Sequence, residues 1–172
     1  MTRPTLGAVV IGRNEGDRLK ACLHSLVPLC ARVVYVDSGS GDDSVAFARG
    51  LGVTLVELDT STPFTAARAR NAGFQALLAG GELDLVQFVD GDCKVEPGWL
   101  QAGVTALAER PDLGLVTGWR SEIHPLASVY NQMCQVEWRR PAGPISACGG
   151  DMMVRVAGFR KAGGFDPTVI AA

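Results

Sequence analysis

Apolar residues recur along the chain in two alternating patterns. Short runs rich in Val, Ile and Leu are typical of strands, and most are followed by segments in which apolar residues return every three or four positions, as on one face of a helix. Strands are expected at residues 6–11, 33–36, 53–58, 85–89, 113–117 and 152–154. Helices are expected at residues 19–26, 44–51, 66–78, 99–108, 128–140 and 156–162.

Proline and glycine mark the ends of several of these elements. Pro28 ends the first helix, and Gly52 and Gly163 occupy positions at which helices commonly stop. Strands and helices alternate over the first two-thirds of the chain, an order that calls for right-handed crossovers. The predicted fold class is therefore α/β, with a doubly wound, Rossmann-like and mostly parallel sheet that carries helices on both faces.

The composition indicates a soluble globular domain. The chain has 172 residues, of which 47% are hydrophobic and 20% charged, and a formal net charge of -2. This length fits a single domain, and no apolar run approaches the roughly 20 residues that span a bilayer. The arginines are scattered, so no nucleic-acid partner is expected. The five cysteines include no C-x-x-C pair, and the first strand begins too early to leave room for a signal peptide, so a cytoplasmic location is expected.

Three polar segments follow predicted strands directly. They are Arg13-Asn14-Glu15 after the first strand, Asp37 after the second and Asp90-Gly91-Asp92 after the fourth. Ligands of open α/β sheets bind outside the carboxyl ends of the strands, so these residues are the first candidates for a site. Asp90 and Asp92 together are suited to one hard cation, Mn²⁺ or Mg²⁺, whose remaining positions a diphosphate would fill. The alternative for this triplet, taken alone, is a surface turn, because Asp-Gly is a common turn dipeptide.

The other polar candidates have structural alternatives as well. Taken alone, Asp37 is better explained as an acceptor of hydrogen bonds from the Ser38–Gly41 turn. An arginine such as Arg70 on an alanine-rich helix is usually solvated, although a guanidinium near a helix start is also able to pair with a phosphate or a base carbonyl. Cys93 lies beside the acidic triplet without a histidine at a recognisable distance, which favours a buried small side chain over a nucleophile.

Taken together, these residues resemble family 2 of the inverting glycosyltransferases, which have the GT-A fold. The resemblance runs from about Leu6 to the last residue, and four motifs in the family's order carry it. They are Val9-Val10-Ile11-Gly12-Arg13-Asn14-Glu15, Val34-Tyr35-Val36-Asp37-Ser38-Gly39-Ser40-Gly41-Asp42, Ala69-Arg70-Asn71-Ala72-Gly73 and Phe88-Val89-Asp90-Gly91-Asp92. The last of these is the D-x-D motif.

The resemblance implies transfer of a sugar, with inversion, from a nucleotide diphosphate sugar, with UDP as the expected nucleotide, to an acceptor hydroxyl. It implies that Asp37 binds a uracil-like base, that Glu15 lies near the ribose and that Arg70 helps at the base or the phosphates. Asp90 is expected on the ribose side and near the metal, and Asp92 on the divalent cation. Arg13 is expected among the substrate-binding residues. The acceptor remains open among a carbohydrate, a lipid and a small molecule, and membrane association is expected only through segments outside this chain.

The chain departs from the family pattern near its end. Family members carry an acidic pair shortly after a Gly-Gly-Phe-Asp stretch, and here Gly163-Gly164-Phe165-Asp166 is followed by only six more residues. We therefore expect residues 1–172 to form a single nucleotide-sugar-binding domain that lacks the acceptor and base segment, binds the donor and transfers poorly. Asp151 is retained as a candidate for the base, although a structural or sugar-contacting role is favoured for it.

Three other classes of protein bind nucleotides with a related α/β fold. A Rossmann-type dehydrogenase is disfavoured because its first turn reads G-x-G-x-x-G, whereas this chain has Gly12-Arg13-Asn14-Glu15-Gly16. A sugar nucleotidyltransferase is disfavoured because its glycine-rich basic phosphate loop is missing from the sequence. A non-enzymatic nucleotide-binding module with the same fold remains the alternative, because fold alone does not decide turnover.

Overall fold

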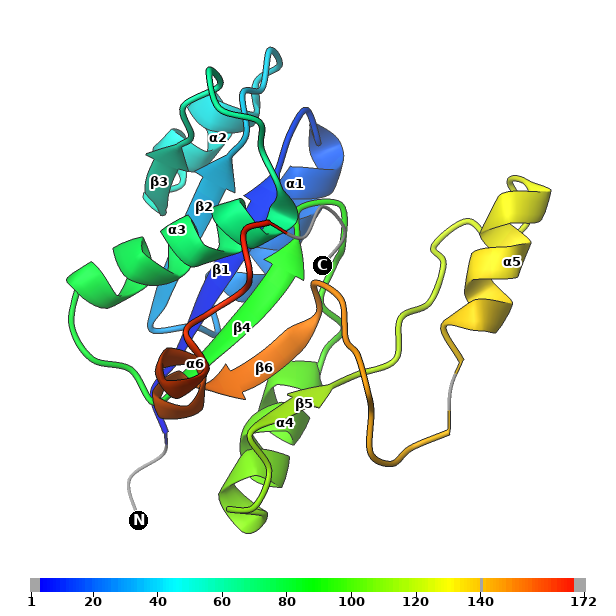
Figure 1. Ribbon diagram of the computed structural model, residues 1–172. Helices are drawn as coiled ribbons and strands as arrows, with labels where there is room; N and C mark the ends of the chain where they lie inside the picture. Colours follow the sequence, from blue (N-terminus) through cyan, green and yellow to red (C-terminus); the bar gives the residue numbers. More distant parts are fainter. Residues whose placement is uncertain (1–3, 140, 169–172) are drawn as a thin grey trace.

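The structure, a computed structural model, describes residues 4–139 and 141–168. Its centre is a six-stranded sheet with strand order β3-β2-β1-β4-β6-β5 (Figure 1). The strands are β1 (Leu6–Gly12), β2 (Arg32–Asp37), β3 (Thr54–Glu57), β4 (Leu85–Asp90), β5 (Leu115–Thr117) and β6 (Met152–Arg155). The helices are α1 (Asp17–Leu26), α2 (Ser44–Gly50), α3 (Ala66–Ala79), α4 (Trp99–Glu109), α5 (Val129–Glu137) and α6 (Val156–Ala162).

The pairing of the strands confirms the mostly parallel sheet. β1 pairs in parallel with both β2 and β4, and β2 pairs in parallel with β3. β6 runs antiparallel to its neighbours β4 and β5. The hydrophobic pattern predicted β6 as a strand but carries no information on direction, since a period of two residues reads the same both ways.

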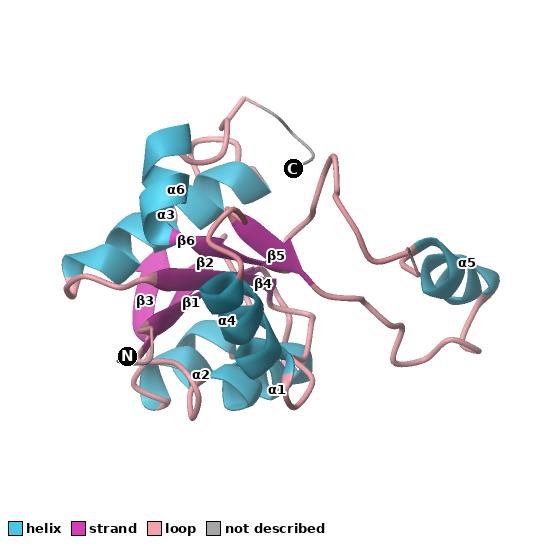
Figure 2. Cartoon of the chain, turned by 90° about the horizontal axis from the view of Figure 1, so that it is seen from below, coloured by secondary structure: helices cyan, strands magenta, loops and turns pink. Residues whose placement is uncertain are grey.

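Helices cover both faces of the sheet, as the sequence predicted (Figure 2). One core joins the sheet to α1 and α4, with Leu19, Leu23 and Leu107 almost fully buried. The core on the other face joins it to α3 and α6, where Phe74 and Phe159 stack with Phe88 of β4. Burying both faces of the central strands explains why they read as continuous apolar runs instead of an alternating pattern.

The segment between β5 and β6 differs from the rest of the chain. It includes α5, which begins at an N-cap where the Ser128 hydroxyl accepts a hydrogen bond from the backbone N–H of Asn131. None of the residues of α5 is buried, and Figure 1 shows the helix standing away from the sheet on two long connections. The predicted helix at 128–140 is thus present but shorter, and its predicted last residue, 140, lies outside the described residues.

Candidate functional site

The carboxyl ends of β1, β2 and β4 meet at one edge of the sheet. Gly12 of β1 pairs with Asp37 of β2, and Ile11 of β1 pairs with Asp90 of β4. The two predicted aspartates therefore flank the end of the same central strand. This register brings the polar segments after three strands to one place, as expected for a binding site of an open α/β sheet.

Asp37 is buried and fully engaged with its own strand and turn. Its Oδ2 accepts hydrogen bonds from the backbone N–H groups of Gly39 (2.9 Å) and Ser40 (2.8 Å). Its Oδ1 accepts from the Tyr35 hydroxyl at 2.8 Å and from the Ser40 hydroxyl. A carboxylate offers about four acceptor positions, so these donors occupy its capacity. The turn-stabilising alternative for Asp37 is thus present in the structure.

Asn14 ties the loop after β1 to the loop after β2. Its side-chain oxygen accepts from the backbone N–H of Gly41 at 2.7 Å, and its own N–H donates to the Ser40 hydroxyl at 2.9 Å. Asn14 has a φ of 56°, a left-handed conformation that asparagine tolerates better than most residues. The neighbouring Arg13 lies on the rim, with its guanidinium carbon 5.5 Å from the centre of the Phe64 ring.

Asp90 is oriented by an arginine from α3. Nη2 of Arg70 lies 2.8 Å from Oδ1 of Asp90, and the arginine side chain is only 3% exposed. The same guanidinium lies over the ring of Phe165, 5.4 Å from its centre. The usual solvated role of a helix arginine is therefore wrong for Arg70. The side chain belongs to the site, where it holds the first carboxylate of the triplet in place.

Gly150 closes over the Arg70–Asp90 pair. A Cβ at this position would lie 2.5 Å from Nη2 of Arg70 and closer still to both carboxylate oxygens of Asp90. Only a residue without a side chain fits here. Gly150 was not among the residues predicted for the site, although a Gly-Gly doublet directly before a strand indicates close backbone approach.

Gly91, between the two aspartates, also serves close packing. Its N–H donates to the carbonyl of Ile11 at 2.7 Å, and a Cβ on it would lie 3.1 Å from that oxygen and 3.3 Å from Cγ of Glu15. The triplet is thereby pressed against the end of β1 and the loop that follows. Burial raises the pKa of Glu15, the positive charge of Arg18 opposes this shift, and the negative charge of Asp92 adds to it.

Asp92 is the more available carboxylate of the triplet. Its one described hydrogen bond comes from the thiol of Cys93, 3.4 Å from Oδ1. Cys93 is half-buried, and burial raises the pKa of its thiol to about 12, which disfavours the thiolate that a nucleophile requires. Within residues 4–139 and 141–168, no three His, Cys, Asp or Glu side chains form a group able to hold a metal ion by themselves. The donor set fits Mn²⁺ or Mg²⁺ only if a ligand such as a diphosphate supplies further oxygens.

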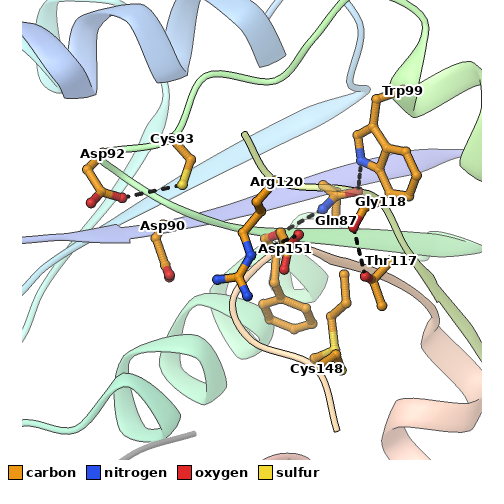
Figure 3. Close-up of polar contacts among 12 residues, drawn as sticks. Gln87, Asp90, Asp92, Cys93, Trp99, Thr117, Gly118, Arg120, Cys148 and Asp151 are labelled. Atoms are coloured by element: carbon orange, nitrogen blue, oxygen red, sulfur yellow. Dashed lines mark hydrogen bonds and ion pairs between the residues drawn. The ribbon is translucent and has the colours of Figure 1, made fainter. Parts of the chain in front are cut away.

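Asp151 lies at the entrance to β6, beside these residues (Figure 3). Its Oδ2 is 3.7 Å from Nε of Arg120, and the guanidinium carbon of Arg120 is 5.0 Å from the centre of the Trp138 ring. Burial raises the pKa of Asp151, the positive charge of Arg120 opposes this shift, and the charge of Asp90 adds to it. Gly150, which directly precedes Asp151, lies against Asp90, so Asp151 is near the first carboxylate of the triplet. Arg120 and Trp138 are contributed by the segment around α5 and had no sequence signal.

Within the described part of the chain, no helix is long and apolar enough to cross a lipid bilayer.

Solved glycosyltransferases share this fold. The mannosyltransferase PcManGT from Pyrobaculum calidifontis, in complex with GDP-Man and Mn²⁺, is 22% identical with a TM-score of 0.69, and the match covers 99% of this chain and 50% of that one. Glucosyl-3-phosphoglycerate synthase from Mycobacterium tuberculosis, in complex with Mn²⁺, UDP and glucosyl-3-phosphoglycerate, is 22% identical with a TM-score of 0.59, covering 88% of this chain and 57% of that one. The chain thus spans about half the length of these proteins.

The family of this chain is identified from its sequence. The model of glycosyl transferase family 2 matches residues 8–146, which include the ends of β1, β2 and β4 and the Asp90-Gly91-Asp92 triplet. The fold, the order of the motifs and this match agree, and the chain belongs to glycosyl transferase family 2, with a GT-A fold.

Proposed function

We propose that this domain binds a nucleotide diphosphate sugar, with UDP as the nucleotide, and presents it for transfer to an acceptor hydroxyl with inversion. The observation that carries the proposal is the Asp90-Gly91-Asp92 triplet at the end of β4, pressed against β1 and oriented by the buried Arg70. The two similar enzymes named above were solved with Mn²⁺ and a GDP-sugar or UDP, which supports the same ligand class here.

The proposed role of each side chain follows from the polar atoms that it has available for a ligand. Asp92, engaged only by the Cys93 thiol among its described hydrogen bonds, would hold Mn²⁺ or Mg²⁺, together with the exposed part of Asp90. When bound, the cation would neutralise the negative charge that develops on the leaving diphosphate. Arg70 keeps Asp90 in one orientation, which spares the site from reorganising when the donor arrives.

The base would lie at Asp37, between the loops that Asn14 joins. A uracil-like base that donates to Asp37 has to replace one of the four present donors. Replacing the hydrogen bond from the Ser40 hydroxyl costs the least free energy, because this hydroxyl rotates freely whereas the two backbone N–H groups are fixed by the turn. Glu15 would then lie on the ribose side, and Arg13 at the rim.

Calorimetric titration of UDP with and without Mn²⁺ tests the donor site. We expect Mn²⁺-dependent binding that weakens at least tenfold in Asp92→Ala, which corresponds to about 1.4 kcal/mol. Asp112→Ala is the matched control, because Asp112 is exposed and pairs with the exposed Arg110 at the far end of α4. Preferential binding of GDP would overturn the assignment of uracil, and absence of binding for both nucleotides would overturn the donor site. Binding of UDP without transfer to any acceptor would favour the non-enzymatic alternative.

A further inference from the structure

A cavity of about 380 Å³ lies between the segment that follows β5 and the segment that precedes β6. Its polar lining comes from Arg120, Glu137 and Asp151, and the indole of Trp138 contributes an aromatic wall. The volume lies within the range of ligand pockets, roughly 300–1,000 Å³. These residues take no part in the donor site proposed above.

The cavity adjoins the place where the donor sugar would be attached. Gly149 and Asp151 line it, and Gly150 between them lies against the Arg70–Asp90 pair. Figure 3 shows Arg120 and Asp151 next to each other, to one side of Asp90. A ligand in the cavity would therefore meet a ligand on the triplet, the arrangement that a transfer between two bound substrates requires.

We propose that this cavity is an acceptor subsite, in contrast to the expectation from the sequence that this domain lacks the acceptor segment, and that it takes a neutral carbohydrate. The inference rests on the proposed donor site, since an acceptor needs a donor beside it. Sugar hydroxyls both donate and accept, and the wall offers guanidinium donors from Arg120 and carboxylate acceptors from Asp151 and Glu137. The C–H groups of a sugar ring also pack well on an aromatic surface, and Trp138, over whose ring the Arg120 guanidinium lies, contributes part of the cavity lining.

The charged residues that line the cavity favour a neutral acceptor over an anionic one. One guanidinium faces two carboxylates, and the guanidinium is already shared with Asp151 at 3.7 Å and with the Trp138 ring. A phosphate or carboxylate on the acceptor would be placed beside like charges, which costs binding energy. Acceptors with a phosphate head, whether soluble or attached to a lipid, are therefore disfavoured in this cavity.

A second and larger cavity does not compete with this assignment. It measures about 750 Å³ and lies between the β5 start and residues 143–148. Its charged residues, Arg110 and Asp112, are paired with each other at 2.7 Å, and the cavity does not include the triplet or Asp151. It therefore has no free charged group directed at a ligand and no access to the donor.

Saturation-transfer NMR in the presence of UDP and Mn²⁺ tests the acceptor class. The probes are the methyl glycosides of glucose, mannose, galactose and N-acetylglucosamine, each compared with the corresponding sugar 6-phosphate. We expect at least one neutral glycoside to bind, and to bind at least tenfold more tightly than its phosphate. Trp138→Leu and Arg120→Met should each weaken that binding at least tenfold. Arg139→Met, a change of an exposed neighbour that does not line the cavity, should leave it unchanged.

Charge reversal at Glu137 supplies a second variant that does not threaten folding, because this side chain is exposed. Glu137→Lys should raise the affinity for the sugar 6-phosphates at least threefold. Tighter binding of phosphates by the unaltered protein, or glycoside binding that ignores both Trp138→Leu and Arg120→Met, would overturn the inference. UDP titration of the same samples keeps the two proposals apart: UDP binding without glycoside binding refutes the acceptor subsite alone, whereas loss of UDP binding in the unaltered protein refutes the donor site.

Discussion

Arg70 of α3 and Asp90 of β4 form an ion pair of 2.8 Å in which the arginine is almost fully buried and the aspartate half exposed. The asymmetry means that one partner is structural and the other faces the ligand. Removing the arginine leaves a carboxylate without its positive partner at the edge of a low-dielectric region, which is costly.

We expect Arg70→Gln to lower the free energy of unfolding by about 1–3 kcal/mol, less than for a fully buried pair because water reaches Asp90. UDP affinity should fall as well, since Asp90 loses its fixed orientation. Urea denaturation and calorimetry measure the two effects. Arg49→Gln serves as the control, because its ion pair with Glu57 is exposed on both sides and should contribute less than about 1 kcal/mol. Equal effects of the two substitutions would contradict the role given to Arg70.

Gly150→Ala should damage the site by overlap alone. The added methyl group would collide with both members of the Arg70–Asp90 pair, so we expect a loss of about 1–3 kcal/mol of stability and a clear loss of UDP binding. Gly158→Ala, eight residues further on in α6, is the matched control, because its Cβ would meet only Cβ of Arg155 at 3.9 Å. That change should be neutral or stabilising by up to about 1 kcal/mol, as alanine is the better helix former. A Gly150→Ala protein with normal stability and binding would show that the segment moves away freely.

Gly73→Ala tests how closely α3 packs on the sheet. A Cβ at Gly73 would lie 2.8 Å from Cγ2 of Val36 and closer still to Cγ1 of Val9. Although alanine favours helix, we expect a net loss of about 1–3 kcal/mol, because both valines are fully buried and have no room to shift. Thermal unfolding followed by circular dichroism measures it. An increase in melting temperature would mean that helix propensity outweighs packing at this contact.

Tyr35→Phe removes one of the four donors to Asp37 without changing the size of the buried ring. We expect a loss of about 1–1.5 kcal/mol in the free energy of unfolding, at the low end for a hydrogen bond to a charged group because three donors remain. UDP affinity should hold or rise, since an acceptor position on Asp37 becomes available to a base. A folded Tyr35→Phe protein that no longer binds UDP would argue against base recognition at Asp37.

Asp151→Asn should separate stability from function. Burial raises the pKa of Asp151 in the folded protein, so the folded state holds this proton more tightly than the unfolded state. Stability from this group is full below its ordinary pKa and is lost as the pH rises through the raised value, which means that the charged side chain is destabilising at neutral pH. We expect Asp151→Asn to raise the melting temperature at pH 7 by on the order of 2 °C, the size of shift that about 0.5–1 kcal/mol produces in a domain of this length.

The pH dependence supplies the control for that prediction. Below the ordinary pKa of aspartate, both proteins carry a neutral side chain at position 151, so their melting temperatures should converge. If the acceptor subsite is correct, the same substitution also weakens glycoside binding at pH 7. A difference in melting temperature that persists unchanged into acid would point to packing instead of ionisation.

The sequence by itself determined the elements and the strand ends. Residues 85–89 and 33–36 read as buried strands because central parallel strands are covered on both faces, and Asp37 and Asp90 follow them because polar residues are tolerated where the strands emerge. The helix at 156–162, with its stop at Gly163, was likewise predicted from local preferences and confirmed.

The tertiary structure alone decided which of these residues meet. Three different segments of the chain contribute Arg70, Asp90 and Gly150. The hydrophobic period of the sequence does not reveal that the Arg70–Asp90 ion pair lies against a position where a side chain would collide with it. The antiparallel direction of β6 and the cavity around Trp138 were equally unreadable, because both depend on where the long segment after β5 returns to the sheet. Local patterns encode period and turn chemistry, whereas the approach of distant segments is set by packing across the whole sheet.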